Sequence, residues 1–174
     1  MKVGASQMHR FLIPLIALFA ALPTFAQTPE PAPMIELHAR CIDDAQCRFL
    51  GDDVRVELEL RNSGRNNVSL PVAFLRKRGP SVRLVDRHSG KEKQLRRNPV
   101  DGLMLKDLET LAPGQSVRFT WPITPKEITD FALRPIDLDA VFGLNITPER
   151  KGADATIIRA RLHIVDGRVG EGAR

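Results

Sequence analysis

The only thiols in the chain, Cys41 and Cys47, are separated by five residues. A loop of this length can bring the two Cα atoms within the roughly 4–7 Å that a disulfide requires. Catalytic redox pairs usually have two residues between the cysteines, and the two aspartates in this spacer disfavour a thiolate. A zinc site would need two more ligands, and His38 is the only histidine nearby. The spacing therefore predicts a disulfide, with a redox pair and a metal site as alternatives.

Four carboxylates lie in or just after the cysteine loop: Asp43, Asp44, Asp52 and Asp53. Calcium prefers such oxygen ligands on a loop, although the spacing here does not follow the EF-hand order. A glycosidase pair would need aromatic sugar platforms, and aromatic residues make up only 5% of the chain. We therefore expect a structural loop and no cofactor. Binding of calcium, or of another metal or small ligand, by residues 43–53 is the alternative.

Basic residues concentrate in two stretches, 76–83 and 86–97. The candidate basic surface comprises Arg76, Lys77, Arg78, Arg87, Lys91, Lys93, Arg96 and Arg97. Such a surface can contact an anionic envelope component or an acidic partner protein, or it can protect a strand edge from aggregation. The formal net charge is only +5, and few aromatic residues are available to stack on bases. We therefore expect no nucleic-acid partner.

No catalytic set is evident in the sequence. The histidines His38, His88 and His163 fall on separate expected strands or turns. The chain lacks a nucleophile-elbow motif, an HExxH motif and a Gly-rich phosphate loop. These observations predict a non-enzymatic protein, and an enzyme whose site is assembled from dispersed residues is the remaining alternative.

Residues 1–26 start with basic residues, continue with an apolar stretch at 11–22 and end in TFA. This order is typical of a secretory signal peptide cleaved after Ala26, and the apolar stretch is shorter than the roughly 20 residues of a membrane span. We expect a periplasmic or secreted protein that does not span a membrane after cleavage. The remaining chain is expected to form a Pro-rich spacer (27–33), one domain (34–166) and a flexible tail (167–174).

Alternating apolar and polar residues predict β-strands separated by Gly, Pro and Asn turns. Strands are expected at 34–39, 53–62, 68–77, 81–91, 108–124, 135–147 and 155–165. A short helix capped by Thr124 is expected at 125–132, and 102–109 forms either a helical turn or a strand. Trp121 is expected to anchor the core. The predicted fold is an all-β, immunoglobulin-like antiparallel β-sandwich of seven to nine strands.

Three stretches, VELELRNSGRNNVSLPV, VRLVDRHSGKEKQL and LAPGQSVRFTW, resemble the domain family named after the intracellular proteinase inhibitor of Bacillus. The residues that carry the resemblance are Asn62, Asp86, Gly90, Pro113, Gly114, Ser116 and Trp121. The match covers residues 53–122 and implies an immunoglobulin-like fold with an inhibitor-like role. We therefore expect a module that recognises a protein partner through its loops or an edge strand.

Overall fold

The computed structural model describes residues 35–132, 135–147 and 156–167. The predicted signal peptide, the spacer and residues 168–174 of the predicted tail lie outside the described residues. Within the described residues, no helix is both long and apolar enough to cross a membrane.

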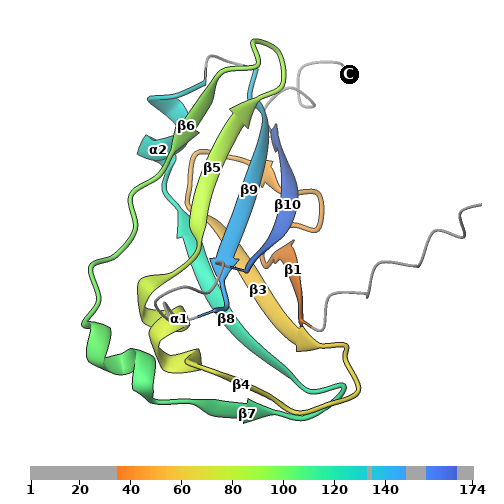
Figure 1. Ribbon diagram of the computed structural model, residues 1–174. Coiled ribbons are helices and arrows are strands. Elements are labelled where there is room, and N and C mark those ends of the chain that lie inside the picture. The colour runs from red at the N-terminus through yellow and green to blue at the C-terminus, as the bar shows by residue number, and fades with distance from the viewer. Residues whose placement is uncertain (1–34, 133–134, 148–155, 168–174) are drawn as a thin grey trace, which may run out of the picture. The chain divides into compact units, whose positions relative to one another are not determined.

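Strands dominate the described residues, which confirms the predicted all-β fold (Figure 1). The strands are β1 Ile35–Cys41, β2 Arg48–Phe49, β3 Val54–Asn62, β4 Val68–Leu70, β5 Ser81–Asp86, β6 Glu92–Gln94, β7 Glu109–Leu111, β8 Ser116–Ile123, β9 Asp137–Asn145 and β10 Ile157–Asp166. The helical segments are α1 Val72–Arg78, the 3₁₀ helix η1 Gly102–Lys106 and α2 Pro125–Thr129. The short strands β2 and β6 were not predicted, because two or three residues are too few to show alternation.

Two sheets contain most of the strands. One has the order β1-β3-β8 and the other β2-β10-β9-β5-β6, while β4 and β7 form a separate pair. The pairing of β10 with β2 is parallel, and the other pairings are antiparallel. Both sheets contribute buried side chains to one hydrophobic core, so their apolar faces pack on each other.

The central strand β3 shows why these residues form a sheet. Val54, Val56, Leu58 and Leu60 are buried, while the intervening charged residues are exposed or half-buried. Successive side chains of a strand point to opposite faces, so this alternation places one apolar row on the core. The same reasoning holds for β9 and β10, whose apolar rows were predicted with the observed alternation.

The predicted strand 68–77 is wrong beyond Leu70. Pro71 has no N–H with which to continue the ladder, so β4 ends there and α1 begins at the next residue. The N–H of Leu75 donates to the Pro71 carbonyl over 2.9 Å, closing the first helical turn. The helix buries Val72 and Phe74 together with Leu75 against the core.

Two other local predictions concern helices. In α2, the Thr124 hydroxyl accepts from the Glu127 N–H, and the Glu127 carboxylate accepts from the Thr124 N–H. This capping box confirms the predicted helix start. Residues 102–106 form η1, whose first turn is capped by the Asp101 side chain accepting from the Leu103 N–H.

Asn62 is a fully buried polar residue that ties two turns together. Its Nδ2 donates to the carbonyls of Asn66 and Leu111, and its Oδ1 accepts from the Gly64 N–H. Its own backbone carbonyl accepts from the Gly114 N–H. Because each polar group is satisfied, the buried amide stabilises this end of the fold instead of weakening it.

Trp121 packs against the core but is half-buried, so it lies at the margin of the core. Its ring covers Gly79, which follows α1 with a φ of 72°. A Cβ at Gly79 would lie 2.1 Å from Cζ3 of Trp121. With a ψ of 175°, its backbone lies in a region that is nearly restricted to glycine, and the absence of a Cβ also allows the close approach of the indole.

We predict that Gly79→Ala destabilises the protein more than Gly90→Ala. Both positions have similar positive φ, 72° and 70°, but a Cβ at Gly90 meets nothing within 4 Å. The control should cost about 1 kcal/mol for the left-handed conformation. Gly79→Ala should cost a further 1–3 kcal/mol or so, because the Trp121 ring must move and because the ψ of 175° at Gly79 strains a residue with a Cβ. Urea unfolding measures both values, and equal costs would contradict the packing argument.

Candidate functional site

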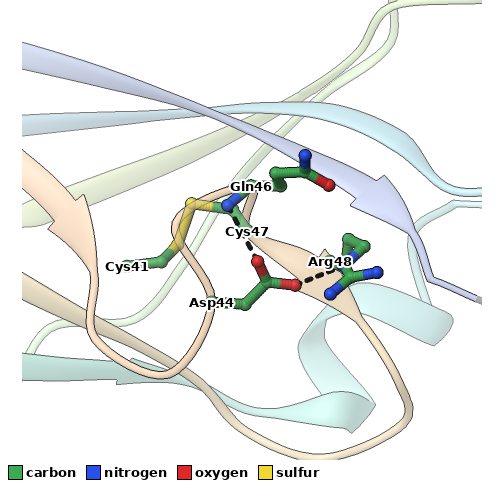
Figure 2. The surroundings of a disulfide bond; sticks show 5 residues. All are labelled: Cys41, Asp44, Gln46, Cys47 and Arg48. Atoms are coloured by element: carbon green, nitrogen blue, oxygen red, sulfur yellow. Dashed lines mark hydrogen bonds and ion pairs between the residues drawn. A yellow bond between two sulfur atoms is a disulfide. The ribbon is translucent and has the colours of Figure 1, made fainter.

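The cysteine loop contains the predicted disulfide, Cys41–Cys47, with the two Cα atoms 5.5 Å apart (Figure 2). Cys41 ends β1, and Cys47 directly precedes β2. Cys47 has a φ of 52°, which is uncommon for a residue with a side chain, and its N–H donates to the Asp44 carbonyl. The disulfide therefore holds a tight loop between two strands of different sheets.

Two of the four loop carboxylates are engaged by arginines. Asp43 accepts hydrogen bonds from Nε and Nη2 of Arg55. Asp44 accepts from Nε of Arg48 at 2.5 Å and from the Gln46 N–H at 2.9 Å (Figure 2). These hydrogen bonds, with Arg55 and Arg48 as the largest causes, lower the pKa of each carboxyl group. The negative charges of Asp43 and Asp44 are thus already compensated.

The loop offers little room for an ion. The cavity beside the disulfide measures about 30 Å³, and Asp43, Asp44 and Asp53 share it with Arg48 and Arg55. Among residues 35–132, 135–147 and 156–167, no group of three or more His, Cys, Asp or Glu residues is placed to hold a metal ion. Asp52 is exposed outside this cavity.

The predicted basic surface divides into separate groups. Arg76, Lys77 and Arg78 occupy the last turn of α1. Arg87 and Lys91 flank the hairpin turn between β5 and β6, and Nζ of Lys93 donates to the Glu127 carbonyl. Arg96 and Arg97 follow β6, and Arg97 lines the same cavity as Arg78. The strand β5 separates the α1 group from the hairpin group.

A further feature was not predicted: β1 and β10 lie side by side without pairing (Figure 1). β1 pairs with β3, while β10 pairs with β9 and reaches β2 only at Val165 and Asp166. In the described parts of the chain, no backbone hydrogen bond joins β1 to β10. We call this place the seam, comprising residues 35–38 of β1 and 157–159 of β10, which line a groove of about 320 Å³.

The seam combines apolar side chains with charged ones of both signs. Ala39, Ala160 and Leu162 are only partly buried against the core near it. Ile157 at its rim is 44% exposed, which is high for a large apolar side chain. Arg159 lines the groove and forms no ion pair within the described residues. On the β1 side, Glu36 accepts a hydrogen bond from His38 at 3.2 Å.

Sequence reasoning also missed a charged network on the outer face of the larger sheet. Nε2 of His163 lies 2.6 Å from Oδ1 of Asp137 and 3.0 Å from Nη1 of Arg87. A protonated Nε2 donates to the carboxylate and therefore cannot accept from the guanidinium. Among the described residues, no Ser, Thr or Cys side chain hydrogen-bonds to His163. Within the part of the chain that the structure describes, His163 and Asp137 are therefore not joined by the nucleophile of a hydrolytic triad.

Comparisons with known proteins do not assign a family. No family model matches the chain, and no curated protein matches it. Among solved structures, the chain is similar to a β-glucosidase from Erythrobacter marinus at 10% identity and a TM-score of 0.39, covering 75% of this chain and 15% of the glucosidase. It is also similar to a Northeast Structural Genomics Consortium target at 10% identity and a TM-score of 0.37, covering 76% of this chain and 85% of the target. At these TM-scores, neither likeness supports an argument about function.

We predict that replacing both cysteines by serine lowers the free energy of unfolding by about 2 kcal/mol, because the unfolded chain loses the constraint of a short closed loop. A reductant should lower the melting temperature of the unmodified protein and leave that of the Cys41→Ser, Cys47→Ser variant unchanged. Equal reductant responses would contradict the stabilising role of the disulfide, and mass spectrometry without reduction should find the two cysteines joined.

The ion pair of Asp43 with Arg55 predicts a pH dependence. Because the folded-state pKa of Asp43 is lowered, its contribution to stability is present above the ordinary carboxyl pKa of about 4 and is lost as pH falls through the lower folded value. Arg55→Gln should therefore destabilise the protein above about pH 5, and this difference should shrink towards pH 2 or so. Urea unfolding across this range measures the effect. Arg65→Gln, which removes an exposed charge elsewhere, should show no such convergence.

Proposed function

We propose that this protein is an exported, non-enzymatic interaction module that binds an extended, acidic segment of a partner protein by strand addition at the seam. In strand addition, main-chain hydrogen bonds supply affinity, and alternate side chains supply specificity. The observation that carries the proposal is the juxtaposition, along one groove, of two strand edges that have no strand partner among the described residues.

The free edges explain how an extended segment binds. Among the described residues, the N–H and C=O groups of β10 that face away from β9 have no strand partner before Val165. The outer edge of β1 is unpaired along Ile35–Cys41 within the described residues. Unpaired strand edges are templates for an additional strand, and the apolar side chains at the rim of the groove offer a surface for every second residue.

The charge at the seam explains the preference for acidic partners. Arg159 and Arg161 project from the same outer face of β10, and both are exposed. Arg161 lies 3.9 Å from Asp139, whereas Arg159 is unpaired within the described residues. An incoming strand with carboxylates at alternate positions would compensate Arg159 and gain a faster, electrostatically guided association.

Export is the second part of the proposal. The disulfide persists in an oxidising compartment such as the periplasm or the extracellular space. The signal-like sequence at 1–26 agrees with that compartment. The resemblance to proteinase-inhibitor domains makes a protease one class of partner, and an anionic envelope component is the alternative partner for the basic residues.

We predict that a hexapeptide of alternating Glu and Val binds the purified protein and slows amide hydrogen exchange in β1 or β10, because it pairs with the free edge of one of them. A hexapeptide of alternating Lys and Val should not. Arg159→Glu should weaken binding of the acidic peptide at least tenfold or so, the effect of one close charge pair.

Arg65→Glu is the matched control, since it makes the same charge change at an exposed position in the turn between β3 and β4. It should leave the affinity unchanged within about twofold, because it lies outside the seam. Equal binding of the acidic and basic peptides, or protection confined to other strands, would overturn the proposed function.

A further inference from the structure

A cavity of about 290 Å³ opens between α1, the segment that contains η1 and the end of β9. Its apolar wall includes Phe74, Leu75 and Leu105 together with Leu144. The volume lies at the lower end of the range of ligand pockets, roughly 300–1,000 Å³, so it suits a molecule smaller than most drug-sized ligands.

Two guanidinium groups, those of Arg78 and Arg97, line this apolar cavity. No Asp or Glu is among the described residues that line it, and neither arginine forms an ion pair within the described residues. Partial burial and, secondarily, the nearby charge of Arg78 lower the pKa of Arg97. Arg78 is half-buried and Arg97 is exposed at the cavity. Two neighbouring cations without a counter-ion among the described residues repel each other, and a bound anion would relieve this repulsion.

The surrounding structure holds both arginines at the cavity. The guanidinium of Arg78 lies 5.5 Å from the centroid of the Phe74 ring, within the range of a cation–π interaction. The segment that carries Arg97 is tied to the end of α1 by a hydrogen bond from Nδ2 of Asn98 to the Lys77 carbonyl. It is also tied to β5 by the Leu95 N–H, which donates to the Val82 carbonyl.

Polar groups from β9 complete the cavity. Asn145 and Thr147 line it opposite the helical elements, and Oδ1 of Asn145 accepts from the Thr147 N–H. With Oδ1 engaged, the remaining polar group of the Asn145 side chain is the Nδ2 donor. The cavity therefore presents hydrogen-bond donors beside an aliphatic and aromatic wall, which is the chemistry of a site for an amphipathic anion.

We propose that this cavity binds a small amphipathic anion, with its carboxylate or phosphate head on Arg78 and Arg97 and its aliphatic chain against Phe74, Leu75 and Leu105. Guanidinium groups suit both heads, because their paired N–H donors match two oxygens of the anion. The proposal does not depend on strand addition at the seam, which uses other residues of the fold.

Octyl phosphate and octanoate are the probes, titrated as monomers into the purified protein at about 150 mM salt, which screens general surface attraction. Calorimetry gives the affinity, and the fluorescence of Trp121 gives a local readout. This residue is the single tryptophan of the chain, and its ring lies against Gly79 at the cavity wall. We expect at least one of the two anions to bind, and octanol, inorganic phosphate and acetate to bind at least tenfold or so more weakly. The ratio of the two affinities identifies the preferred head group.

Arg97→Gln should weaken binding of the preferred probe at least tenfold or so, because it removes a charge-assisted contact. Arg96→Gln is the matched control: it makes the same charge change at the adjacent exposed residue, which does not line the cavity. Thermal unfolding checks that both variants remain folded. The proposal is overturned if neither anion binds, or if both variants lose affinity equally. It is also overturned if octanol binds the unmodified protein as tightly as octyl phosphate does.

Discussion

The burial of two apolar sheet faces in one shared core is the constraint on which the rest of this structure depends. Side chains of β3 and β9, the central strands of their sheets, are among the most buried in the protein. Packing sheets face to face satisfies these side chains but leaves the backbone groups at the lateral edges of each sheet without partners. The seam between β1 and β10 is a direct consequence, because the two strands approach through packing and not through hydrogen bonds.

Among the described residues, polar groups at the ends of the sheets find hydrogen-bond partners, whereas backbone groups at the lateral edges have no strand partner. Asn62 satisfies the turns around it through its side-chain amide, and the Cys41–Cys47 disulfide links the end of β1 to the start of β2. The disulfide and the hydrogen bonds of Asn62 stabilise the loops without adding a strand to either sheet. Other edge strands, β8 and β6, end their sheets elsewhere, whereas at the seam two edges lie side by side, which gives the proposed partner-binding role a definite location.

Arginines serve two roles in this protein. Arg55 and Arg48 compensate aspartates in the disulfide loop, at exposed positions where such pairs contribute little to stability. Arg78 and Arg97 instead meet in an apolar cavity with no carboxylate among the described lining residues. An arginine paired with a carboxylate has its charge compensated. Two arginines at a cavity without a carboxylate among the described lining residues are better placed to bind an anion. This contrast in pairing, more than the total positive charge, distinguishes the cavity from the rest of the basic surface.

Local interactions are what the sequence by itself determined. Alternation along residues 53–62, the capping box at Thr124 and the short cysteine spacing each involve neighbours a few residues apart, so they could be predicted. The prediction failed at α1, because Val72 and Phe74 favour a strand locally while packing against the core favours the helix. The seam and the two-arginine cavity were decided only by the tertiary structure, since they join segments far apart in the chain. Their positions depend on sheet order and packing, which residue spacing does not encode.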